Sequence, residues 1–123
     1  MTKARSLGIT VFPYMEFDSN GKRTYYENEK GYWVIREYNS QGKCIYCENT
    51  KKAGGYYEKW RKEYDERGNE TYYEDLGRHP HWHRSEYNSQ GKRISFTNSD
   101  GIWWKREYDE NGNFLSEKNS WIK

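Results

Sequence analysis

Apolar and polar residues alternate over short stretches of this chain, and polar segments containing glycine separate the stretches. In one of them, Trp33, Ile35 and Glu37 share one phase of the alternation, and the residues between them share the other. Stretches such as 24–27 and 71–74 are rich in β-branched and aromatic residues. No segment matches the spacing of an amphipathic helix comparably well. The pattern therefore predicts short strands joined by turns.

A six-residue motif, Glu-aromatic-Asp/Asn-x-x-Gly, recurs along the chain. Its five copies span 16–21, 37–42, 63–68, 86–91 and 107–112, so consecutive copies are 21, 26, 23 and 21 residues apart. Self-similarity of this period indicates a repeat architecture. The Asp or Asn side chain accepts hydrogen bonds from the backbone just ahead, and the glycine adopts the positive φ that closes a hairpin. Each motif therefore predicts a β-hairpin turn.

A second turn, seen at 28–31 and 98–101, returns the chain toward the next motif. Two turns per repeat predict an all-β fold, an antiparallel meander of about five tandem β-hairpin repeats forming an elongated, twisted sheet. We expect one β-repeat domain over 1–123, with an N-terminal cap at 1–15, five repeats in 16–119 and a C-terminal cap at 120–123. Ile9 and Val11 are expected in a strand covering the first repeat, and Trp121 is expected to cover the other end.

The composition suggests how such a sheet holds together. Aromatic residues make up 19% of the chain and charged residues 33%, so Tyr and Trp must supply most of the buried area. The net charge is only +2 and is spread along the chain, which does not indicate non-specific nucleic-acid binding. We find no signal peptide, no membrane-spanning segment and only two cysteines, and we expect a soluble, cytoplasmic protein without a membrane partner.

Two of the turns carry a more specific pattern. The Tyr-Asp-x-x-Gly-Asn units at 64–69 and 108–113 resemble the YD repeats of the RHS family. The resemblance runs from about Glu16 to Asn119 and implies strands that serve as a shell, a scaffold or a binding surface. Five repeats are too few to close the cocoon of the large family members. Small phage and bacterial proteins have a similar texture of Trp and Tyr-Asx-Gly, and that likeness is an analogy.

Two groups of residues suggest metal binding. Cys44 and Cys47 form a CxxC pattern, but their odd separation on a strand points them to opposite faces. Cys47 occupies a repeat position that is elsewhere aromatic, so we expect it in the core. His79, His81 and His83 would point one way from an extended backbone. No Asp or Cys lies at close ligand spacing to them, which favours a solvated, partner-facing loop. We expect no metal and no cofactor.

Catalytic chemistry is not indicated. The sequence contains no nucleophile paired with an oriented base and no glycine-rich phosphate loop opening a helix. Glu27, Glu48 and Glu74 recur at one repeat position, which favours a structural role in pairing with Lys or Arg across strands. We therefore expect that the protein is not an enzyme.

Differences in length between the repeats suggest a binding face. The steps from glycine to the next motif are six residues in 31–37 but eight in 55–63 and nine in 77–86, so the insertions fall in neighbouring repeats. Drift in these loops is the alternative. Trp60 and Trp104 are expected to be exposed anchors beside the core positions. The candidate partner-binding residues are Tyr57, Trp60, Arg61, His79, His81, Trp82, His83 and Trp104.

The leading hypothesis is a non-catalytic protein-binding module, such as a phage-encoded stoichiometric inhibitor of a bacterial defence system that resembles an anti-CRISPR protein. Its partner would be another protein, for instance one of a bacterial host. A second hypothesis is an aromatic sheet surface that binds single-stranded nucleic acid or glycan by stacking. A third is a structural repeat piece of a larger assembly, whose open sheet ends pair with copies of itself in a homo-oligomer.

Overall fold

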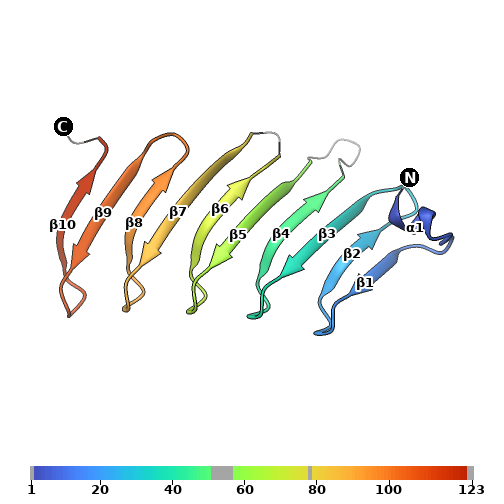
Figure 1. Ribbon diagram of the computed structural model, residues 1–123, viewed down its shortest axis with the longest axis horizontal. Coiled ribbons are helices and arrows are strands. Elements are labelled where there is room, and N and C mark those ends of the chain that lie inside the picture. The colour runs from blue at the N-terminus through green and yellow to red at the C-terminus, as the bar shows by residue number, and fades with distance from the viewer. Residues whose placement is uncertain (1, 51–56, 78, 122–123) are drawn as a thin grey trace. The chain divides into compact units, whose positions relative to one another are not determined.

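The computed structural model describes residues 2–50, 57–77 and 79–121. Within these residues the chain forms one short helix and ten strands (Figure 1). The elements are α1 (Lys3–Ser6), β1 (Tyr14–Phe17), β2 (Arg23–Glu27), β3 (Trp33–Tyr38), β4 (Cys44–Asn49), β5 (Lys59–Tyr64), β6 (Glu70–Asp75), β7 (His81–Tyr87), β8 (Arg93–Asn98), β9 (Trp103–Tyr108) and β10 (Phe114–Asn119).

The strands form one open antiparallel sheet in which they follow the order of the chain from β1 to β10. This meander confirms the predicted all-β fold of tandem hairpins. The chain divides into two compact units, which we describe separately. The N-terminal unit contains residues 1–61 and 76–78, and the C-terminal unit contains residues 62–75 and 79–123.

The motif turns have the predicted geometry. The five motif glycines are left-handed, with φ values of 81° at Gly21, 78° at Gly42, 86° at Gly68, 79° at Gly91 and 85° at Gly112. In the first turn, Asp18 Oδ1 accepts hydrogen bonds from the backbone N–H groups of Asn20 and Lys22, each at 2.9 Å. Within the N-terminal unit, the β1–β2 and β3–β4 turns lie at one edge of the strands and the β2–β3 turn lies at the other (Figure 1).

The register defines two faces of the sheet. In the N-terminal unit, Val34 is paired with Asn49 and Arg36 with Cys47, so these four residues share one face. Val34 is 7% exposed and Cys47 3%, which confirms the predicted core position of Cys47. In the C-terminal unit, Ser85 is buried opposite Phe96, which occupies the same repeat position as Cys47. The opposite face of the N-terminal unit carries Tyr25, which is buried beside α1.

The prediction that Ile9 and Val11 lie in a strand is wrong. Residues 3–6 form α1 instead, and Val11 is 80% exposed. Thr2 Oγ1 caps the start of the helix. At its end, Gly8 donates to the Arg5 carbonyl at 3.1 Å and Ile9 donates to the Ala4 carbonyl at 3.0 Å, which is a Schellman motif. The capping hydrogen bonds at both ends of α1 therefore favour a short helix in this segment.

The C-terminal end also differs from the expectation. Trp121 was expected to cover the last strand, but its side chain is 59% exposed. The edge strand β10 keeps Phe114 and Leu115 exposed as well. The described part of this end therefore presents apolar side chains to solvent.

Candidate functional site

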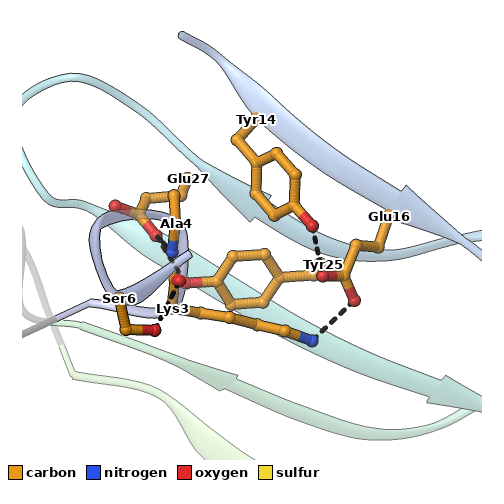
Figure 2. A network of polar contacts seen from close by, with 7 residues as sticks. All are labelled: Lys3, Ala4, Ser6, Tyr14, Glu16, Tyr25 and Glu27. Atoms are coloured by element: carbon orange, nitrogen blue, oxygen red, sulfur yellow. Dashed lines mark hydrogen bonds and ion pairs between the residues drawn. The ribbon is translucent and has the colours of Figure 1, made fainter. Parts of the chain in front are cut away.

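A buried carboxylate attaches α1 to the sheet of the N-terminal unit. Glu27 is 0% exposed and accepts a hydrogen bond from the Thr2 hydroxyl. It also accepts from the Ala4 N–H at 3.0 Å and from the Tyr25 hydroxyl at 2.8 Å (Figure 2). Burial raises the pKa of Glu27, but these three hydrogen bonds and the charge of Arg5 together lower it by more, so the pKa lies below its ordinary value. The carboxylate is therefore the anchor of the helix.

A tyrosine hydroxyl recurs as the partner of these glutamates. Besides Tyr25, the hydroxyl of Tyr46 donates to Glu48 at 2.6 Å, two residues further along the same strand. The pKa of Tyr25 and that of Tyr46 are raised by burial and by the bonded carboxylate. We predicted that Glu27 and Glu48 pair with Lys or Arg across strands. Glu27 instead accepts from two hydroxyls and a backbone N–H, and Glu48 accepts from tyrosine hydroxyls. In each case one donor is the tyrosine two residues away on the same face.

A groove of about 610 Å³ lies in this unit between α1 and strands β1 to β3, and its lining includes Lys3, Glu16, Tyr25, Trp33, Ile35 and Glu37. At one side of the groove, the Lys3 ammonium contacts Glu16 at 2.6 Å and lies 5.3 Å from the centre of the Tyr25 ring (Figure 2). Hydrogen bonds from Lys3 and from Tyr14 lower the pKa of Glu16.

The C-terminal unit has a different chemistry on the face that carries Ser85. Four rings from successive strands, the ring row of Tyr73, His83, Phe96 and Trp104, stack across the sheet. Successive ring centres are 5.3, 5.9 and 6.1 Å apart, with interplanar angles of 20°, 29° and 17°. The register produces the row, since Tyr73 is opposite His83 and Phe96 is opposite Trp104.

Two arginine side chains contact rings of the ring row. The Arg106 guanidinium lies 4.0 Å from the centre of the Trp104 ring and donates to Glu117 on β10 at 2.6 Å. Arg93 lies 5.7 Å from the Phe96 ring and 5.8 Å from the Trp104 ring. These contacts join β8, β9 and β10 side by side.

The last two strands of the C-terminal unit expose large apolar side chains. This outer apolar group consists of Ile102 at 42% exposed, Trp103 at 39%, Phe114 at 58%, Leu115 at 59% and Trp121 at 59%. These side chains do not form one patch, because Trp103 lies on the face opposite Trp104, whereas Phe114 is paired with Tyr108 and contacts its ring on the face of Trp104. The exposed Trp103 is a candidate anchor for an interaction. The sequence-based prediction had instead assigned the exposed anchor to Trp104, which is half-buried. The strand register decides which of the two tryptophans is exposed. The structure exposes Trp103, whereas the prediction had chosen Trp104.

The other predicted site residues are distributed between the two units. In the C-terminal unit, His83 is in the ring row, His81 lies 5.8 Å from the Tyr73 ring, and Trp82 stacks on Tyr72 on the opposite face. His79 is exposed before β7. In the N-terminal unit, Trp60 is half-buried opposite Cys47, and Tyr57 and Arg61 are exposed. Residues 55 and 56 of the insertion in 55–63 lie outside the described residues. Partner binding by these residues stays a prediction.

Sequence reasoning missed Phe96, Arg93 and Arg106 as parts of one surface. Phe96 and Tyr73 occupy the same repeat position, and that shared position was the signal that could have revealed the row. The three histidines do not form a cluster, although His81 Nδ1 lies 2.8 Å from the His79 carbonyl oxygen. Across residues 2–50, 57–77 and 79–121, we find no group of three or more His, Cys, Asp or Glu side chains suited to hold a metal ion.

Comparisons with known proteins support the fold. No family model matches the chain, and no curated protein matches it. A solved structure, the crystal structure of TcdB2-TccC3-Cdc42, is similar with a TM-score of 0.56 and 15% identity. The match covers 86% of this chain but only 7% of that chain. The likeness shows a shared β-rich repeat fold. Among the described residues, no helix has the length and apolarity needed to span a bilayer.

Proposed function

We propose that this protein is a non-catalytic protein-binding module that contacts its partner through exposed apolar side chains of the outer apolar group in the C-terminal unit, with Trp103 as the main anchor. The observation that carries the proposal is the exposure of five large apolar side chains on and beside β9 and β10. Exposed Trp residues are typical anchors of protein interfaces. Trp103 is therefore the anchor that we assign to this interface.

The ring row supports this surface by holding its strands in place. Phe96 stacks on Trp104 from the neighbouring strand, and Arg106 bonds to Glu117 on β10. A surface that is rigid before binding loses less conformational entropy when the partner docks. The exposed side chains of β9 and β10 are thus presented on a backbone that is already ordered.

Charge favours a protein partner over single-stranded nucleic acid. The C-terminal unit contains 9 Lys and Arg residues against 12 Asp and Glu, whereas the N-terminal unit contains 12 against 7. Phosphate contacts need an excess of cations near the binding surface. In addition, a stacked base needs an open ring face, and the ring faces in the ring row are occupied by one another and by arginine.

The Tyr-Asp-x-x-Gly-Asn turns and the likeness to a known repeat fold together support a YD-like repeat as the framework of this module. One-to-one inhibition of a bacterial defence protein is a specific form of the proposal. Identifying the captured partner tests whether it is a bacterial defence protein.

The experiment is capture of partners from lysate, followed by binding measurements with the purified partner. Replacing Trp103 and Leu115 together by Ser is expected to weaken binding by at least about tenfold, since buried interface anchors dominate affinity. The matched control replaces Leu7 and Val11, which are exposed in the N-terminal unit, by Ser. Circular dichroism checks that both variants are folded.

The proposal fails if the Trp103 and Leu115 variant binds the captured partner as tightly as the original chain. It also fails if labelled single-stranded oligonucleotides bind the chain more tightly than any captured protein, with an affinity that falls steeply as salt rises.

A further inference from the structure

Two lysines face one another beside Trp103, on the last two strands of the C-terminal unit. Lys105 on β9 is directly opposite Lys118 on β10, and both side chains are exposed. Because side chains alternate along a strand, Trp103 and Lys105 lie on the same face of the sheet. The Ser120 backbone bonds to the Trp103 backbone, so Ser120 and Lys118 also lie on this face. Trp103 is therefore next to two ammonium groups, which we call the lysine pair.

The lysine pair is unusual among the cross-strand pairs of the sheet. In the described ladders from β1 to β5 and from β6 to β10, it is the only directly opposed pair with charges of the same sign. By contrast, Arg106 is opposite Glu117 on the other face of the same two strands. Directly opposed residues have Cβ atoms about 5 Å apart, and like charges placed in this way destabilise a sheet.

No acidic side chain of the described residues offsets this repulsion through an ion pair. Glu107 follows Lys105 by two residues on the same face, but it is opposite Ser116 and forms no ion pair. Glu86 is two strands away from Lys105, with Ser95 between them. Neither lysine of the pair donates a hydrogen bond from its ammonium group to a described residue. A bound anion would therefore relieve a repulsion that the chain itself leaves in place.

We propose that Trp103 and the lysine pair bind an extended partner segment in which an acidic side chain lies two residues from an apolar one. The carboxylate contacts the ammonium groups of Lys105 and Lys118, and the apolar side chain packs on the Trp103 ring. Residues two apart on a strand are about 7 Å apart, which is the spacing of Trp103 and Lys105 and of the matching pair in an extended segment.

The charge of the C-terminal unit favours a single carboxylate over a polyanion. This unit contains 9 Lys and Arg residues against 12 Asp and Glu, so a chain of phosphates would be repelled beyond the lysine pair. The inference rests on the proposed function, because it specifies the chemistry of the partner that Trp103 anchors.

The test is a titration of the full ¹⁵N-labelled chain with two capped tripeptides, Glu-Gly-Phe and Gln-Gly-Phe. The Trp103 indole N–H, assigned with a Trp103→Phe variant, is expected to shift with both peptides, because both carry the apolar side chain. The backbone amides of Lys105 and Lys118 are expected to shift with Glu-Gly-Phe only. That peptide should bind about threefold more tightly, which is the scale of an exposed ion pair.

Lys118→Gln removes one ammonium group of the pair. It is expected to weaken binding of Glu-Gly-Phe about threefold and to leave binding of Gln-Gly-Phe unchanged. It should also raise the urea midpoint of the free chain, because the like-charge repulsion is lost, whereas loss of a stabilising lysine would lower that midpoint. The matched control is Lys30→Gln, at an exposed lysine in the turn between β2 and β3, which should leave both affinities unchanged.

The inference is overturned if the two peptides bind equally well, or if Lys118→Gln binds Glu-Gly-Phe as tightly as the original chain does. It is also overturned if inorganic phosphate, at the same concentration, shifts the Lys105 and Lys118 amides as strongly as Glu-Gly-Phe does, since the pair would then be a phosphate site. These outcomes leave the proposed function intact, because capture of a partner with the Trp103 and Leu115 variant tests that function separately.

Discussion

The two units have the same hairpin repeat and stabilise it in different ways. In the N-terminal unit, Tyr25 and Glu27 form a hydrogen-bonded pair beneath α1. In the C-terminal unit, the same repeat positions hold Tyr72 and Glu74 in β6 but Ser95 and Thr97 in β8, and the ring row stacks on the other face. The comparison shows that the turns define the repeat. The side-chain contacts on each face vary with the residues that the individual strands carry.

The largest expected effect comes from breaking the N-terminal anchor. In Glu27→Ala, the donors of Thr2, Ala4 and Tyr25 lose their shared acceptor, and an unpaired buried polar group costs about 1–3 kcal/mol. Hydrogen exchange should show faster exchange of the Ala4 N–H and lower stability of the N-terminal unit. Glu74 occupies the matching position of the C-terminal unit and is only half-buried, so Glu74→Ala should lower the free energy of unfolding by less. Equal losses in the two variants would contradict the anchor.

A smaller effect should be the same in both units, because it acts on the turns. Gly21→Ala and Gly91→Ala place a side chain at φ values of 81° and 79°, where a left-handed conformation costs about 1–2 kcal/mol. Nothing lies within 4 Å of the added carbon at either position, so backbone strain is the whole effect. Urea unfolding of the two variants should give similar losses. A large loss in only one unit would show that turn strain does not explain the repeat.

The smallest effect is a pH dependence that belongs to the N-terminal anchor. Because the folded state lowers the pKa of Glu27, the resulting stabilisation is complete above the ordinary glutamate pKa of about 4.3 and is lost as the pH falls through the lower folded value. Protection of the Ala4 N–H from exchange should therefore fall in acid. In Glu27→Gln this acid-dependent loss should disappear, since the amide does not titrate in this range. If Glu27→Gln kept the same pH profile as the original chain, the loss of protection in acid would come from other carboxylates.

Much of the fold could be predicted because its signals are local. The spacing of Asp18 and Gly21 determines a turn within a few residues, and the same spacing recurs in every repeat. The candidate surfaces were harder to predict. Trp103 and Trp104 are adjacent in the sequence, and only the pairing of Phe96 with Trp104 decides which of them joins the ring row. Shifting the register by one residue exchanges the faces of a strand.

By itself, the sequence determined the hairpin turns, the order of the strands and the core position of Cys47, since these follow from backbone geometry and alternation over short distances. Only the tertiary structure decided that Glu27 is buried under α1, that Tyr73, His83, Phe96 and Trp104 stack, and that Trp103 remains exposed. These features depend on contacts between residues far apart in the chain. Their geometry exists only after the strands have paired in one register.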